Sequence, residues 1–330
     1  MSPSQDDALK VLLTQIDKKY GKGSVMSFTE TPQFDPESVI PSGSIGLDLA
    51  LGIGGYKRGR VVEVYGQESA GKSTLCLHAV ANTQKAGGRC LFIDQEHSLD
   101  INYAEILGVK IDELLISQPD TAEQALDLVD MFVKSDLIDL IVVDSVAALV
   151  PQKELEGEVG EQVIGLQARL MSQTLRKIVG PCSKTNTTII FTNQIRNKIG
   201  VMFGSPNITS GGNALKFYAS QRLEIIRTGN LKVGDQIIGN TTKVKVVKNK
   251  VAPPKKEAEF NIIFGKGIDT DSEIIILAKE DGIIKQSGAW FKYGEDNIAQ
   301  GLPNAIMWLN ENPDKKKEIL DTILANRGLE

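Results

Sequence analysis

The sequence is poor in the residues that build metal centres and disulfide scaffolds. Its 330 residues include three cysteines and two histidines. The cysteines, at positions 76, 90 and 182, form no Cys-x-x-Cys pair, and the histidines, at positions 78 and 97, lie near no cysteine cluster. This composition argues against a structural zinc site and against a secreted, disulfide-bonded fold. It predicts buried, reduced thiols in a cytoplasmic protein.

Long apolar segments are also missing. No stretch approaches the roughly 20 apolar residues that a membrane-spanning helix requires. The N-terminal segment MSPSQDDALK lacks the basic and apolar parts of a secretory signal. Hydrophobic residues make up 41% and charged residues 24% of the chain, as in ordinary globular proteins. The sequence therefore predicts no membrane partner, and its length suffices for one large domain and a smaller one.

The net charge of −5 does not by itself suggest a polyanionic partner. The distribution of charge does. Residues 196–250 contain ten Lys and Arg against two Asp and Glu, so this segment carries +8 and the rest of the chain −13. Such segregation is what a local polyanion site requires, although a solvated basic face explains it equally well.

Short apolar segments alternate with helical patterns over residues 46–195, which is typical of a doubly wound α/β fold with a mostly parallel sheet. The predicted strands are 61–65, 90–93, 140–143 and 188–191, and the predicted crossover helices are 73–86, 121–135 and 165–180. Antiparallel additions are expected at 222–226, 242–247 and 259–264, with turns at 229–230 and 239–240.

Three parts of the chain are predicted from these patterns. Residues 1–33 contain leucines and an isoleucine at helical spacing, which indicates an amphipathic N-terminal helix and a linker. That helix docks either on its own domain or on a neighbouring subunit. Residues 34–269 form the core, and residues 270–330 form a small α/β C-terminal domain.

The segment GQESAGKS, residues 66–73, matches the phosphate-binding pattern G-x-x-x-x-G-K-[ST] between an apolar strand and a helical pattern. The backbone of such a loop cradles phosphate oxygens at a helix N-terminus. Lys72 is expected to reach the β- and γ-phosphates, and Ser73 is expected to bind Mg²⁺. The loop residues are Gly66, Gln67, Glu68, Ser69, Ala70, Gly71, Lys72 and Ser73.

Polar residues follow three further strands, at the edge of the sheet where open α/β folds bind ligands. Asp144 fits a ligand of Mg²⁺ through water, or else a simple helix cap. Glu96 and Asp94 fit equally well as the group that activates water, and the Gln194 amide fits a contact to the γ-phosphate. Adenine is favoured over guanine, because neither Asn-Lys segment (197–200 or 249–252) ends in the aspartate that guanine recognition needs.

Seven segments are distinctive: GQESAGKST (66–74), FIDQEHSLD (92–100), IVVDSVAAL (141–149), GLQARLMS (165–172), NQIRNKIGVMFG (193–204), GGNALKFYAS (211–220) and KVKVVKNK (243–250). Together they resemble the bacterial RecA family of DNA recombinases, and the resemblance covers residues 5 to 325. The resemblance implies a P-loop, RecA-like core and a DNA-dependent ATPase. Such an enzyme forms helical filaments on single-stranded DNA, pairs it with homologous double-stranded DNA, and stimulates self-cleavage of a LexA-type repressor.

The resemblance also implies roles for single residues. It makes Glu96 rather than Asp94 the general base, and it places Lys248 and Lys250 at the ATP of the neighbouring subunit. With Lys72 and Gln194 these three form the expected catalytic set. Thr74, Asp100, Tyr103 and Phe264 join the nucleotide-binding residues, and Ser73 and Asp144, through water, hold Mg²⁺.

Two DNA-binding loops are implied, at residues 157–169 and 194–209. The expected DNA-binding residues are Ile164, Arg169, Ser172, Arg176, Arg196, Lys198, Ile199, Gly211, Gly212 and Asn213. The expected subunit-interface residues are Lys216, Phe217 and Arg222. A ring-shaped motor of the same fold and a small-molecule kinase are the alternatives, but the kinase leaves the basic segment 196–250 unexplained.

Overall fold

The computed structural model describes residues 3–21, 24–25, 36–158, 165–197 and 207–329. The chain divides into two compact units, Met1–Asp35 and Pro36–Glu330. The first unit contains helix α1 (Pro3–Tyr20), whose apolar residues Leu9 and Leu12 are about half exposed (45% and 51%). Among the described residues, no helix has both the length and the apolar character needed to span a bilayer.

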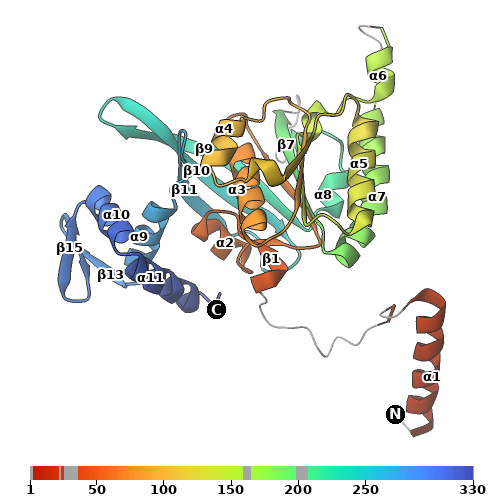
Figure 1. The fold of residues 1–330 in the computed structure, drawn as a ribbon, viewed down its shortest axis with the longest axis horizontal. Helices are drawn as coiled ribbons and strands as arrows, with labels where there is room; N and C mark the ends of the chain where they lie inside the picture. Colours follow the sequence, from red (N-terminus) through yellow and green to blue (C-terminus); the bar gives the residue numbers. More distant parts are fainter. Residues whose placement is uncertain (1–2, 22–23, 26–35, 159–164, 198–206, 330) are drawn as a thin grey trace. The chain divides into compact units, whose positions relative to one another are not determined.

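A ten-stranded sheet forms the centre of the second unit (Figure 1). Its strands lie in the order β12-β11-β10-β9-β3-β7-β6-β4-β5, and β8 pairs with β7 off this path. The parallel part consists of β3 (Val61–Gly66), β4 (Cys90–Asp94), β5 (Leu114–Ser117), β6 (Leu140–Asp144), β7 (Thr188–Asn197) and β9 (Gln221–Val233). The antiparallel part consists of β8 (Asn207–Thr209), β10 (Gln236–Asn249), β11 (Glu257–Ile263) and β12 (Gly267–Ile268).

Helices cover both faces of this sheet (Figure 1). One face packs against α2 (Ile45–Leu51), α3 (Lys72–Lys85) and α4 (Ile101–Ile106), and the other against α5 (Ala122–Ser135), α7 (Leu166–Thr185) and α8 (Ala214–Tyr218). Shorter elements are η2 (Pro36–Ser38), β1 (Val39–Ile40), β2 (Tyr56–Lys57), η3 (Ile111–Glu113), η4 (Val146–Ala148) and α6 (Gln152–Glu156). Every residue of β3, β4 and β6 is buried because helices cover both faces of the parallel part. The predicted doubly wound α/β fold is therefore confirmed.

The C-terminal part has its own hydrophobic core. It contains α9 (Thr270–Glu280), β13 (Ile284–Ser287), β14 (Trp290–Tyr293), β15 (Asp296–Gln300), α10 (Leu302–Glu311) and α11 (Pro313–Asn326). The three strands form an antiparallel sheet. Glu273 of α9 joins this part to α2, because its Oε1 accepts hydrogen bonds from Ser44 Oγ at 2.7 Å and from the Gly46 amide at 3.1 Å.

The predicted turns at 229–230 and 239–240 were wrong. Both glycines lie inside the long strands β9 and β10, and the chain reverses at residues 234–235. Gly239 stands at a register shift, and a Cβ there would lie 2.3 Å from the Ile262 carbonyl oxygen. This glycine therefore permits close approach of a neighbouring strand at a bulge rather than a turn.

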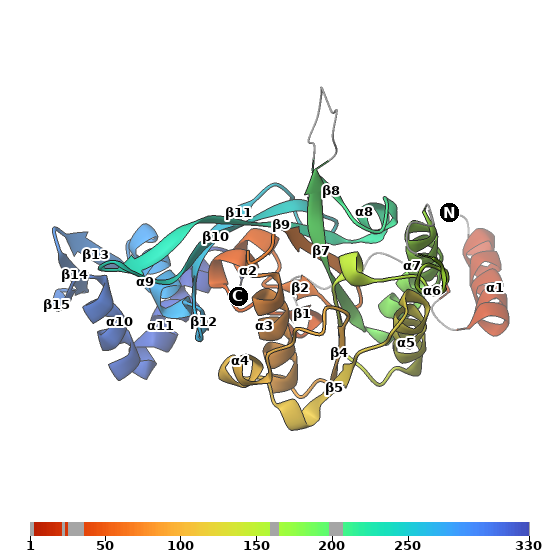
Figure 2. The same ribbon diagram turned by 90° about the horizontal axis from the view of Figure 1, so that it is seen from above.

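The ends of the two predicted DNA loops also differ from expectation. β7 continues past Gln194 to Asn197 and pairs antiparallel with β8 (Figure 2). Backbone pairing thus extends into both ends of the segment predicted as an irregular loop. In the first loop, residues 166–169 already form the first turn of α7.

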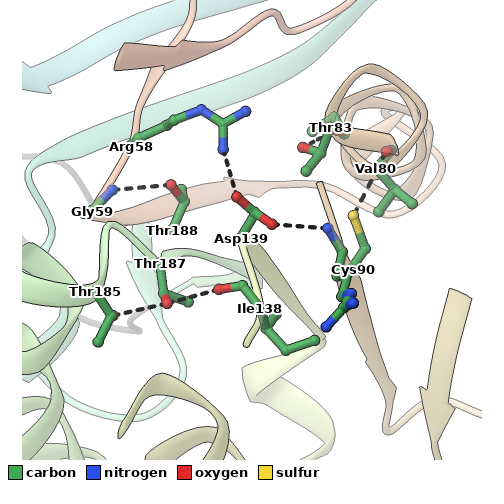
Figure 3. Close-up of polar contacts among 12 residues, drawn as sticks. Arg58, Gly59, Val80, Thr83, Cys90, Ile138, Asp139, Thr185, Thr187 and Thr188 are labelled. Carbon is green, nitrogen blue, oxygen red and sulfur yellow. Dashed lines mark hydrogen bonds and ion pairs between the residues drawn. The ribbon is translucent and has the colours of Figure 1, made fainter. Parts of the chain in front are cut away.

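The amino-terminal edge of the parallel strands holds several separate polar contacts within the chain (Figure 3). Asp139, directly before β6, accepts hydrogen bonds from Arg58 Nη1 at 3.2 Å and from the Arg89 amide at 2.9 Å. Nearby, Thr188 Oγ1 accepts from the Gly59 amide at 3.2 Å, and Thr187 Oγ1 donates to the Ile138 carbonyl at 2.8 Å. These polar groups satisfy one another and join neighbouring segments.

Candidate functional site

The opposite, carboxyl-terminal edge of the sheet gathers the residues that the sequence singled out. The parallel register places Gly66 of β3 beside Gln194 of β7, and Asp94 of β4 beside Asp144 of β6. Four strands from distant parts of the sequence thus deliver polar groups to one edge. A pocket of about 900 Å³ opens there.

The phosphate-binding loop connects β3 to α3, which begins at Lys72. Gly71 has a φ of +103°, and a Cβ there would lie 2.4 Å from Ile262 Cδ1. At Gly66 a Cβ would lie 2.2 Å from the Ile225 carbonyl oxygen. Both glycines are therefore needed for close packing against β9 and β11, in addition to leaving the loop backbone open to phosphate.

Lys72 is 9% exposed, and its amine donates a hydrogen bond to the Gln67 carbonyl oxygen at 2.8 Å. Burial lowers the pKa of Lys72 below its ordinary value, while the neighbouring carboxylates of Asp144 and Glu96 act in the opposite direction. The ammonium group is thus partly desolvated inside the curl of the loop. An anion bound there would offset that cost.

Two hydroxyl groups hold the carboxylate of Asp144. Ser73 Oγ donates to Asp144 Oδ2 at 2.7 Å, and Thr192 Oγ1 donates to Asp144 Oδ1 at 2.6 Å. Burial raises the pKa of Asp144 above its ordinary value, and these two hydrogen bonds oppose the rise. The cluster of hydroxyl and carboxylate oxygens at the pocket wall is a donor set that fits Mg²⁺.

The structure separates the two carboxylates that spacing alone left equal. Asp94 is 1% exposed and accepts hydrogen bonds from the amides of Ser98 and Leu99 and from Gln118 Nε2. These contacts hold the Asp94 side chain against the loop that follows β4.

Glu96 instead lines the pocket. Its Oε1 accepts hydrogen bonds from Ser145 Oγ at 2.5 Å and from Gln194 Nε2 at 3.2 Å. The candidate general base and the candidate γ-phosphate contact therefore meet directly. Of the two carboxylates, Glu96 is the one placed to contact a water molecule in the pocket.

The far side of the pocket suits a flat base. Tyr103 and Phe264 both line it, and Phe264 is 54% exposed. The Tyr103 hydroxyl lies 3.1 Å from Thr74 Oγ1, and Asp100 caps α4 by accepting from the Tyr103 amide at 3.0 Å. Two aromatic rings and a carboxylate thus lie on this side of the pocket, and such groups can contact a flat base.

Most predicted nucleotide-binding residues line this pocket, but Gly66, Gln67 and Ala70 do not. Sequence reasoning missed six further lining residues: Asn102, Ile106, Arg227, Asn240, Ile262 and Gly265. Four of them lie in or directly after β9, β10 and β11. No local motif marks them, because pairing of these strands beside β3 brings them to the pocket.

The lysine pair lies away from this pocket. Lys248 Nζ donates to the carbonyl oxygens of Lys216 at 2.9 Å and Phe217 at 2.8 Å, next to α8. Burial lowers the pKa of Lys248 to about 8, and the nearby charges of Lys250 and Arg222 act in the same direction. Phe217 is 68% exposed. The five predicted interface and lysine residues thus lie around α8 and the adjoining ends of β9 and β10, and none of them lines the pocket of its own chain.

Part of the predicted DNA surface is described. Arg169, Ser172 and Arg176 recur at helical spacing along one face of α7, and both arginines are exposed. Gly211 and Gly212 have φ values of +79° and +74°, and a Cβ on Gly212 would lie 2.7 Å from Ala168 Cβ of α7. The left-handed glycines thus bring the backbone before Asn213 against α7.

The rest of the predicted DNA surface is less defined. Ile164, Lys198 and Ile199 lie outside the described residues. For Arg196 the structure gives the backbone pairing with Ile208.

Comparison with known proteins agrees with this arrangement. The RecA N-terminal domain family matches residues 7–269, and the RecA C-terminal domain family matches residues 272–328. The chain is 58% identical over 322 residues to Protein RecA of Laribacter hongkongensis (strain HLHK9), covering 98% of this chain and 91% of that protein. The crystal structure of the RadB recombinase is similar in fold, with a TM-score of 0.53 at 22% identity over 70% of this chain and 98% of RadB. The chain therefore belongs to the RecA family, the DNA-dependent ATPases of recombination and repair.

Proposed function

We propose that the pocket at the carboxyl edge binds ATP with Mg²⁺ and that its hydrolysis is coupled to a helical filament on single-stranded DNA. The observation that carries this proposal is the convergence of Lys72, Asp144, Glu96 and Gln194 on one pocket from α3 and three different strands or the loops after them. A P-loop alone is shared by many enzymes. A carboxylate and an amide in direct contact beside it supply both a base and a phosphate contact.

In this proposal Lys72 and the loop amides hold the phosphates, and Ser73 and Asp144, through water, hold the metal ion. Bound Mg²⁺ neutralises phosphate charge. Glu96 orients and deprotonates the attacking water. In the present structure the Gln194 amide donates to Glu96, and a γ-phosphate offers that amide a more highly charged acceptor. When the Gln194 amide contacts the phosphate, its hydrogen bond to Glu96 is lost, and the Glu96 carboxylate can then accept a hydrogen bond from the attacking water.

Gln194 also connects the nucleotide to DNA. It lies on β7 three residues before Asn197, which is the last described residue of β7 and pairs with Asn207 of β8. A shift of Gln194 is passed along this antiparallel pair to the loop 194–209 and to residues 211–213. We assign the DNA contacts to the positively charged and glycine-rich groups predicted above, with Ile164 and Ile199 inserted between bases. Phosphate contacts and counterion release offset the unstacking that such insertion costs.

Lys248 and Lys250 act on the nucleotide of the neighbouring subunit, and Lys216, Phe217 and Arg222 form the surrounding interface. The exposed Phe217 ring gains from being covered by another chain, and the Lys248 ammonium, whose pKa burial lowers, gains from the phosphate anion of a neighbouring nucleotide. Residues 1–33 dock on a neighbouring subunit, 34–269 carry the ATPase and DNA sites, and 270–330 form the accessory C-terminal domain. The filament acts in the cytoplasm, captures double-stranded DNA for homologous pairing, and stimulates self-cleavage of a LexA-type repressor.

The test of the coupled ATPase is the rate of ATP hydrolysis with and without single-stranded DNA. We expect turnover to rise at least about tenfold with DNA and Lys72→Ala to abolish it, because the variant loses the group that holds the phosphates. Negative-stain images with ATP and DNA should show helical filaments. Turnover indifferent to DNA, or closed rings in the images, would favour a motor of the same fold over a recombinase.

The shared site between subunits has a separate test. A Lys248→Ala, Lys250→Ala double variant should lose ATPase activity, because its neighbours lack the two cations. Mixing it with Lys72→Ala subunits should restore part of the activity. Where the two kinds of subunit are neighbours, the double variant supplies an intact pocket with Lys72, and the Lys72→Ala subunit supplies Lys248 and Lys250, so one site is complete. If mixed filaments stay inactive at every ratio, the lysines do not act across the interface.

A further inference from the structure

A buried carboxylate lies in the middle of the central strand β3, outside the nucleotide pocket. Glu63 is 0% exposed, and the parallel register places it between Phe191 of β7 and Arg222 of β9. Its chain neighbours Val62 and Val64 are fully buried core residues. An ionised side chain at such a position is costly unless it is paired and hydrogen-bonded.

Glu63 has a partner on each side. Arg222 Nε donates a hydrogen bond to Glu63 Oε2, and the Arg222 guanidinium also lies 4.7 Å from the centre of the Tyr65 ring. Asn193 Nδ2 donates to Glu63 Oε1 at 3.2 Å. One carboxylate therefore joins side chains of three adjacent strands, β9, β3 and β7.

The network continues outward to two functional regions. On one side, Arg222 of β9 pairs in register with Lys248 of β10, and Lys248 in turn donates to the Phe217 carbonyl oxygen of α8. On the other side, Asn193 contacts both ends of the second predicted DNA loop: Nδ2 donates to the Ser210 carbonyl at 3.0 Å, and Oδ1 accepts from the Gln194 amide at 2.9 Å. The chain of contacts thus runs from the interfacial cations to the base of the loop.

Fold stability alone does not require this arrangement. A buried ion pair is often no more stabilising than well-packed apolar side chains of similar volume, because desolvation offsets the attraction. The charged network does constrain the orientation of its side chains, since each partner must point its donor group at the carboxylate. It therefore sets the orientations of Arg222 and Asn193 relative to each other.

We propose that Glu63 is a positioning residue that couples the interfacial cations around Lys248 to the second DNA loop. It holds Arg222 at the subunit interface and Asn193 at the loop in one hydrogen-bonded unit. When the interface fixes the orientation of Arg222, the orientation of Asn193 is favoured as well, and the reverse holds when DNA orders the loop. This inference rests on the proposed function, in which the lysines serve a neighbouring nucleotide and the loop binds DNA.

The test is a double-mutant cycle in the DNA-stimulated ATPase, with Glu63→Gln, Asn193→Ala and the combined variant. Each single change should lower kcat at saturating DNA by roughly tenfold or more, and the combined variant should be no slower than the slower single variant, because both break the same unit. KM for ATP and nucleotide affinity without DNA should stay within about twofold, since neither residue lines the pocket. A merely structural defect would move nucleotide affinity and thermal stability together.

Asn193→Ala leaves the Glu63–Arg222 pair in place, so it decides the question even if Glu63→Gln does not fold. Asp139→Asn, which removes a polar contact at the opposite edge of the sheet, is the matched control and should retain full DNA stimulation. Normal DNA stimulation in Asn193→Ala would overturn this inference and leave the proposed function intact. So would a combined variant whose loss of kcat equals the product of the two single losses. A wild-type protein without DNA stimulation would instead overturn the proposed function, and this inference with it.

Discussion

Two aspartates flank strand β6 and have opposite surroundings. Asp139 lies just before the strand, where Arg58 and the Arg89 amide pair with its carboxylate (Figure 3). Asp144 ends the strand, where it is 5% exposed and has hydroxyl partners from Ser73 and Thr192. The first is matched to a cation, whereas the second is desolvated beside a pocket.

The difference shows how one sheet separates structure from chemistry. At the amino edge, polar groups are satisfied within the chain and contribute to stability. At the carboxyl edge, burial raises the pKa of Asp144 and lowers that of Lys72. These groups are held ready for a ligand at a cost in the free energy of folding. The same substitution at the two aspartates should therefore have opposite effects.

The largest effect is expected for Asp144→Asn. Because the folded pKa of Asp144 is raised, its contribution to stability is present at low pH and is lost as pH rises through that pKa. The nucleotide-free variant should thus be at least as stable as the wild type at pH 7. Its ATPase activity should fall at least about 1,000-fold, because the proposed contact to Mg²⁺ through water is lost. Urea denaturation and steady-state turnover measure the two effects, and a clearly destabilised variant would break the contrast with Asp139.

A buried carboxylate far from the pocket tests whether desolvation alone is enough for an amide substitution to stabilise the protein at neutral pH. Burial raises the pKa of Glu273 to about 7 from an ordinary value of 4.5. The contribution of Glu273 to wild-type stability should therefore fall as pH rises from about 4.5 to about 7, and Glu273→Gln should remove that contribution. The free energy of unfolding of the variant relative to wild type should increase by about 3 kcal/mol between pH 4.5 and 8.

Urea denaturation at several pH values measures this difference. Asp48, whose pKa burial raises to about 8, is present in both proteins, and loss of the Glu273 charge lowers that pKa somewhat in the variant, because this charge adds to the rise. DNA-stimulated ATPase at pH 7.5 should be normal in Glu273→Gln. A difference in unfolding free energy that is constant with pH would show that Glu273 does not titrate in the folded protein over this range.

The smallest effect is expected for Asp139→Asn. The Asp139 side chain is 42% exposed and Arg58 is 12% exposed, so solvent screens the pair and its loss should cost about 1 kcal/mol. ATPase activity and its DNA stimulation should not change. Denaturation in urea beside a turnover assay checks both, and a loss of turnover without a loss of stability would mean that the amino edge takes part in function.

Much of the candidate site followed from local spacing. The P-loop pattern and the polar residues after apolar strands predicted Lys72, Ser73, Asp144 and Gln194, because parallel strands end at one edge of a sheet. The four predicted core strands are all present. Division of the chain at residues 33 and 269 and the roles of single residues remain predictions.

Other features were beyond the reach of spacing. Gly229 and Gly239 read as turn residues, because a bulge or a close strand contact leaves the same local pattern as a turn. Asp94 and Glu96 lie two positions apart and were equal by spacing. The family resemblance chose Glu96, and in the structure hydrogen bonds to the following loop hold Asp94, which does not line the pocket.

The sequence by itself determined the phosphate loop, the family and the layered α/β architecture, because each depends on residues close together in the chain or on a repeating apolar pattern. Tertiary structure decided which distant strands adjoin β3. That order brings Arg227 and Asn240 to the pocket at the carboxyl edge, and it joins Arg222 and Asn193 through Glu63. Burial between strands far apart in sequence creates these contacts, and no local pattern encodes which strands will pair.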